Sequence, residues 1–70
     1  MSAGFHLSLA SFVGDRDGMA LELTDDISGE LVAEVFEDDV TKARTFTVFG
    51  ERVLPVEVIE WLLFEARSQL

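Results

Sequence analysis

The chain has 70 residues, of which 14 are Asp or Glu and only five are Lys or Arg, so its formal charge is −9; it contains no cysteine. This length allows a single domain, residues 1–70, and the absence of cysteine excludes disulfides, thiol nucleophiles and cysteine-based zinc sites. The acidity disfavours direct nucleic-acid binding because a polyanion repels an acidic surface, while the 49% of apolar residues argues against a disordered chain.

Four segments alternate between apolar and polar residues with a period of two, which predicts β-strands. Clusters of Gly, Asp and Ser separate them, and such short polar turns favour antiparallel neighbours. The predicted strands span residues 5–13, 19–24, 30–37 and 44–49.

After residue 52 the apolar period becomes helical, and we expect a helix over residues 55–68. Pro55 suits the first helical position, where its missing N–H costs nothing, and Arg67 near the end suits the helix dipole. The predicted fold class is α+β: an antiparallel β-meander of four strands with one C-terminal α-helix packed across one face. A three-stranded sheet with an irregular N-terminus is the alternative. Residues 1–4 are expected to be flexible.

The predicted helix carries apolar residues on two sides. At about 100° per residue, one apolar stripe consists of Val56, Ile59, Leu63, Ala66 and Leu70. Leu62 lies on the flank of this stripe, which is predicted to cover the sheet. Trp61 points away from this stripe, flanked by Val58 and Phe64. An amphipathic helix on a one-sided sheet should be polar there, so these residues predict an interface. The alternative is that Trp61 folds over the edge of the core or packs on residues 50–52.

Both faces of the predicted sheet are also partly apolar, although one helix can cover only one of them. Phe12, Phe36 and Phe49 are therefore expected either to be left for a partner or to be curled inward by the sheet twist. The sequence leaves the inward face of the third and fourth strands unassigned.

No catalytic, metal or cofactor site is predicted. Asp15-x-Asp17-Gly18 resembles the start of a calcium loop, but the positions that need Gly and Glu hold Ala20 and Asp26. Adjacent carboxylates in a strand point to opposite faces, which disfavours shared chelation. The single histidine, His6, lies near the N-terminus, where spacing supports no nucleophile–base pair. A carboxylate-based or metal-assisted activity at Asp15, Asp17 or the Asp25–Asp26 pair is the enzymatic alternative.

The acidity predicts a basic protein partner, because complementary charge speeds and directs encounters. We expect a small acidic non-catalytic protein-binding module whose partner or dimer interface contains Val58, Trp61 and Phe64 with Glu57 and Glu60. Three further acids are expected to steer the encounter electrostatically, namely Glu37, Asp38 and Asp39.

In size, charge and composition the chain is similar to small acidic inhibitors, among them immunity proteins paired with nuclease toxins and phage-type anti-defence proteins such as DNA mimics. The similarity implies an inhibitor of a nuclease or of another nucleic-acid-binding protein. Self-association as a homodimer is also expected, because a core of this size supplies only about 3–5 kcal/mol and association would add to it. One alternative is a homo-oligomeric structural protein with no specific partner, and the other is a phage-type anti-defence protein or DNA mimic. Without a signal-peptide pattern or an apolar stretch of about 20 residues, the expected location is cytoplasmic, away from membranes.

Overall fold

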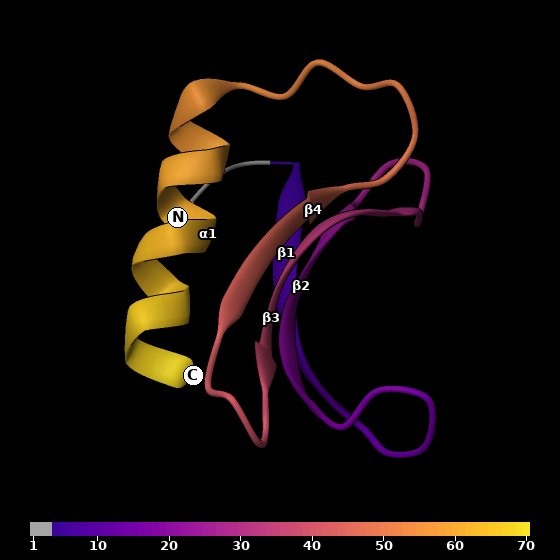
Figure 1. Ribbon diagram of the computed structural model, residues 1–70. Coiled ribbons are helices and arrows are strands. Elements are labelled where there is room, and N and C mark those ends of the chain that lie inside the picture. Colours follow the sequence, from indigo (N-terminus) through magenta and orange to yellow (C-terminus); the bar gives the residue numbers. More distant parts are fainter. Residues whose placement is uncertain (1–3) are drawn as a thin grey trace.

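A computed structural model describes residues 4–70 as one antiparallel sheet with a single helix packed on one face (Figure 1). The strands lie in the order β1-β2-β3-β4, and a C-terminal helix, α1, follows. Their bounds are β1 Phe5–Phe12, β2 Gly18–Asp25, β3 Leu31–Asp38, β4 Arg44–Val48 and α1 Val56–Gln69. The predicted four-stranded meander with a C-terminal helix is confirmed, and the three-stranded alternative is wrong.

The N-terminal ends of α1 and of the sheet are defined by single residues. Pro55 is the N-cap of α1, so the helix begins at Val56, one residue later than predicted. The carbonyl of Gly4 accepts a hydrogen bond from the Asp26 N–H at 2.9 Å. The rest of the predicted flexible N-terminus, residues 1–3, lies outside the described residues.

Two aspartates close the turns on either side of β3. A carboxylate oxygen of Asp25 accepts the N–H of Ile27 at 2.8 Å, and one of Asp38 accepts the N–H of Val40 at the same distance. Such side-chain bonds to the following backbone replace ladder partners where a strand ends. These carboxylates therefore serve the turns that join the strands.

The core lies between the sheet and α1. The register places Leu21 opposite Val35 and Leu23 opposite Ala33, so these side chains form adjacent rows on the helix-facing side. Val32 joins them where the pairing of β2 with β3 shifts register, as a bulge allows. The buried cluster consists of Leu21, Leu23, Val32, Ala33, Val35, Val58, Leu62 and Ala66.

Part of the other face of the sheet is covered by the loop between β1 and β2, which lies on the side away from α1 (Figure 1), whereas Ser8, Thr45 and Thr47 on this face are exposed. The guanidinium of Arg16 lies over the rings of Phe12 and Phe36, 4.3 and 4.4 Å from their centroids. It also donates to both carboxylate oxygens of Glu34, at 2.8 and 3.1 Å. Phe36 is buried as a result, which shows how a sheet covered by one helix still hides aromatic residues on its second face.

The predicted orientation of α1 is wrong. Val58, Leu62 and Ala66 face the core, and Val58, expected to be exposed, is only 3% exposed. The observed orientation differs from the predicted one by roughly a quarter turn at 100° per residue. The observed orientation turns Trp61 toward the sheet and leaves Val56 in solvent. Because an indole is larger than a valine side chain, this orientation removes more apolar area from water than the predicted one would.

Within residues 4–70, no helix has the length and apolar character needed to cross a bilayer.

Candidate interaction surface

The side of α1 that faces solvent carries an apolar patch among charges. Phe64 is 67% exposed, Val56 71% and Leu63 41%. At about 100° per residue these three share one sector of the helix with Glu57 and Glu60. We call these five residues, Val56, Glu57, Glu60, Leu63 and Phe64, the outer helix surface.

Trp61, the predicted central anchor, is not part of this surface. Its indole is partly buried against the core and lines a hollow together with Phe5 and Leu7 of β1. The alternative in which Trp61 folds over the edge of the core is therefore the one that the structure shows. Of the three predicted apolar anchors, only Phe64 is exposed, because Val58 faces the core and Trp61 is partly buried.

The charges on the outer helix surface are arranged along the helix axis. Glu57 lies in the first turn, where the helix dipole favours negative charge, and Glu60 follows one turn later. Glu60, Leu63, Phe64 and Arg67 together line a shallow depression.

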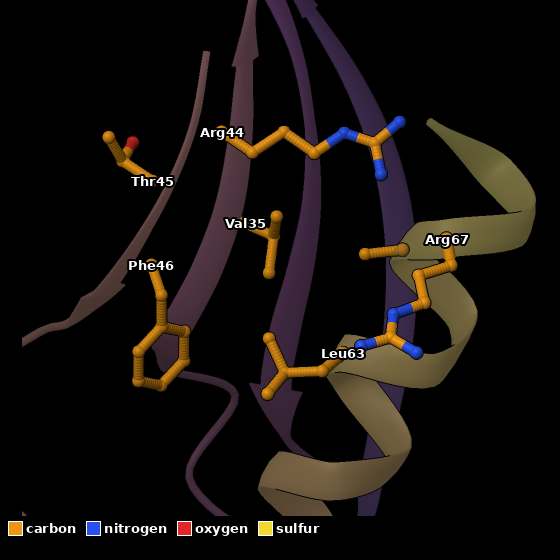
Figure 2. Close-up of a pocket in the computed structure, with 7 residues that line it drawn as sticks. Val35, Arg44, Thr45, Phe46, Leu63 and Arg67 are labelled. Carbon is orange, nitrogen blue, oxygen red and sulfur yellow. The ribbon is translucent and has the colours of Figure 1, made fainter.

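A second depression, the β4 hollow, lies between α1 and β4. Figure 2 shows the side chains of Val35, Phe46 and Leu63 gathered around it, with Arg44 and Arg67 beside them and Thr45 pointing away. The hollow exists because the backbone of α1 approaches β1, β2 and β3 but, in the described part of the chain, not β4. The hollow could not be predicted from the sequence, since it follows from the position of the helix over the sheet.

The predicted steering acids lie apart from the outer helix surface. Glu37 accepts a hydrogen bond from the Nε of Arg44 at 2.8 Å, and Asp38 accepts the backbone N–H groups of the following turn. Those turn bonds, the one from Thr41 first, lower the pKa of Asp38. Asp39 is exposed in the same turn. This turn lies near the C-terminal end of α1, whereas Glu57 and Glu60 lie in its first half (Figure 1).

The Arg16–Glu34 pair is the most buried polar arrangement in residues 4–70, and sequence reasoning missed it. The side chain of Glu34 is 3% exposed, whereas that of Arg16 is 44% exposed. The hydrogen bond to Glu34 raises the pKa of Arg16, and the charges of Glu34 and Glu22 act in the same direction. The sequence contains one indication of this pair, because Glu22 and Glu34 both lie in the middle of predicted strands. The observed pairing puts them opposite each other, where two like charges are unfavourable without a cation.

This arrangement is already satisfied within the chain. Both guanidinium–carboxylate bonds are made, and no buried side-chain N or O atom in the described residues lacks a partner. Among the same residues, no group of three or more His, Asp or Glu side chains is placed to hold a metal ion.

Comparison of the chain with protein-family models, with curated proteins and with solved structures found no match.

Proposed function

We propose that this protein is a small, non-catalytic binding module that docks on a basic protein through the outer helix surface. The observation that carries the proposal is the exposure of Phe64, Leu63 and Val56 beside Glu57 and Glu60 on a chain of charge −9. Exposed aromatic and aliphatic groups ringed by charge are typical of contact surfaces.

The apolar residues supply the short-range part of the contact. Phe64 is the largest of them, and an aromatic side chain removes a large apolar area from water when a partner covers it. Leu63 and Val56 extend the patch along the helix, so a groove or a flat apolar area on the partner can seat one side of α1. This is the helix-in-groove mode of recognition, with α1 as the inserted helix.

The carboxylates supply the long-range attraction to the partner. The formal charge of −9 attracts a basic surface before contact, and Glu57 and Glu60 direct this attraction to the helix. By covering a basic surface the module would block whatever that surface binds, phosphate groups among them, which is the action of an inhibitor. The partner chemistry proposed is thus a protein with a basic patch around an apolar depression.

The test uses the intact chain as bait in native lysate at low and high salt, followed by binding measurements with the purified partner. We expect the captured protein to be basic and its association rate to fall with salt, because screening shortens to about 10 Å at 0.1 M. The Phe64→Ala variant should weaken binding at least tenfold, mainly through faster dissociation. The control Ile27→Ala removes an apolar side chain that is even more exposed, at 94%, in the turn between β2 and β3, and it should leave binding unchanged.

A second pair of variants separates steering from net charge. Glu57→Gln with Glu60→Gln should slow association, whereas Asp15→Asn with Glu51→Gln, which changes the formal charge equally, should slow it less. Capture of an acidic partner, or equal loss of binding with Phe64→Ala and Ile27→Ala, would contradict the proposal.

A further inference from the structure

The outer edge of β4 is unpaired within residues 4–70, since β4 is the last strand of the sheet. Two bonds show which backbone groups face β3: the N–H of Asp38 donates to the carbonyl of Ala43 at 3.0 Å, and that of Phe49 donates to Val32 at 2.9 Å. Hydrogen-bonded and non-hydrogen-bonded pairs alternate along an antiparallel ladder. The N–H and C=O groups of the remaining alternate residues of β4 therefore point outward, namely those of Arg44, Phe46 and Val48.

This edge also lacks the usual protection against pairing with another chain. Proline, bulges and several charged side chains commonly guard edge strands. β4 contains no proline, its pairing with β3 shows no register shift, and its single charge is at its first residue, Arg44. Its helix-facing side chains, Phe46 and Val48, are 43% and 37% exposed, because α1 does not cover them.

The opposite edge of the sheet is different. The helix-facing side chains at the start of β1, Phe5 and Leu7, pack against the core beside Trp61. Farther along β1, Leu9 is 46% exposed, whereas β4 exposes both Phe46 and Val48, so a strand added at β1 would cover less of the exposed apolar surface than a strand added at β4.

We propose that a second copy of this chain adds its own β4 to this edge, so that two sheets join into one through an antiparallel β4–β4 pair. With Phe46 facing Phe46 across a two-fold axis, Arg44 of each copy faces Val48 of the other. These are three hydrogen-bonded residue pairs with two backbone bonds each. Any other symmetric register leaves an outward group of Arg44, Phe46 or Val48 unpaired within the five-residue strand.

The side chains match in the same register. Phe46 meets Phe46 on the helix-facing side, and Thr45 meets Thr47 on the other, and both aromatic and Thr–Thr cross-strand pairs are favourable. Arg44 is held by Glu37 through Nε, and β4 itself contains no carboxylate. The strand that makes the contact thus carries no negative charge, so two copies of an acidic chain meet there with little repulsion.

The inference goes beyond the proposed function, because β4 and the outer helix surface are separate. The two-fold contact is closed, since each copy uses its only β4 edge. It places both α1 helices on the same side of the joined sheet, so a dimer presents two outer helix surfaces in one direction.

The experiment measures mass by sedimentation over a range of concentrations. We expect the wild-type mass to rise from 7.8 kDa toward twice that value. Phe46→Pro removes an outward N–H without touching the β3–β4 ladder and should remain monomeric, as should Phe46→Glu, which puts like charges together at the axis. Circular dichroism checks that each variant is folded. Ser11→Pro, the matched change at the outer edge of β1, should leave dimerisation intact.

A single cysteine tests the register, since the chain has none of its own. Phe46→Cys should oxidise to a disulfide-linked dimer, because the directly paired residues are about 5.5 Å apart and within disulfide reach. Leu9→Cys on β1 is the control and should stay largely uncrosslinked. A wild-type chain that is monomeric at every concentration, a folded Phe46→Glu variant that still dimerises, or preferential crosslinking at Leu9→Cys would overturn the proposal.

Discussion

Replacing Arg16 by Met tests whether a single ion pair closes the face of the sheet that α1 does not cover. Methionine keeps an unbranched side chain against Phe12 and Phe36 but removes the charge and every hydrogen-bond donor. Glu34, whose side chain is 3% exposed, then loses the one cation that pairs with it within residues 4–70 and remains opposite Glu22. We expect a large loss of stability from a substitution that leaves the packing volume almost unchanged.

The magnitude follows from the geometry. Two charge-assisted bonds, at 2.8 and 3.1 Å, join Arg16 to Glu34, and loss of one partner of a buried pair costs about 3–5 kcal/mol. Because Arg16 is 44% exposed, solvent screening lowers this to about 2–3 kcal/mol. A core of this size supplies about 3–5 kcal/mol, so the variant keeps little stability and its Tm falls by about 10–20 °C.

The measurement is urea unfolding at pH 7, followed by the fluorescence of Trp61, which packs against the core. Arg44→Met is the matched control. Its bond to Glu37 is also 2.8 Å long, but both side chains are more accessible to water than Glu34, and exposed pairs contribute about 0.2–1 kcal/mol. If Arg16→Met lost no more stability than Arg44→Met, the ion pair would have no special role in closing this face. Adding Glu34→Met to Arg16→Met should recover stability, because an apolar pair leaves no buried charge.

Three further predictions concern the turns and the helix. Asp38→Ala should destabilise the protein at neutral pH. Because the pKa of Asp38 is lowered in the folded state, the contribution of its carboxylate to stability is complete above about pH 4 and disappears as the pH falls through the folded-state pKa. Urea titrations of the variant and the wild type should therefore converge in acid. Gly18→Ala should cost about 1–3 kcal/mol in thermal unfolding, since its Cβ would overlap the backbone carbonyl oxygen of Glu37 and lie 2.7 Å from the ring of Phe36, and equal stability would contradict that close approach. Val58→Ala should cost about 1–3 kcal/mol in the same assay and Phe64→Ala less than about 0.5, whereas the reverse order would restore the helix orientation predicted from the sequence.

The sheet was predictable because its signals are local. Period-two alternation marks each strand, and the aspartates that end β2 and β3 sit where their side chains can bond to the next backbone N–H groups. Asp25 and Asp38 do so in the structure, so the turns are where the sequence placed them. No strand bound differs from the prediction by more than one residue, which is within the usual uncertainty of element ends.

The orientation of α1 could not be predicted in the same way. Eight of its 14 residues are apolar, so more than one stripe can serve as the buried face. Counting apolar positions favoured the stripe with Val56 and Leu63, but the observed face also accommodates Trp61 at its edge. The size of the indole and the presence of Phe5 and Leu7 beside it are properties of the assembled fold, and the helical period alone does not contain them.

The Arg16 contact shows a second limit. Arg16 lies in a turn-like stretch that reads as a plain loop, and its partner Glu34 is 18 residues away in a strand. Only the register, which sets Glu22 opposite Glu34, reveals two carboxylates that need a cation between the strands. Long-range charge placement of this kind follows from strand pairing, whereas local periodicity describes one strand at a time.

The place of Trp61 also explains why β4 is the strand left open. A helix with its side chains is about 10–12 Å wide, and four strands spaced by about 4.8 Å span more than that, so one helix leaves an edge strand uncovered. Trp61 packs on the β1 side of α1, which draws the helix toward β1 and away from β4. The same displacement exposes Phe46 and Leu63 around the β4 hollow. The residue that the sequence suggested as an interface anchor thus acts indirectly: by packing inside its own subunit it determines which apolar surface is free for another chain.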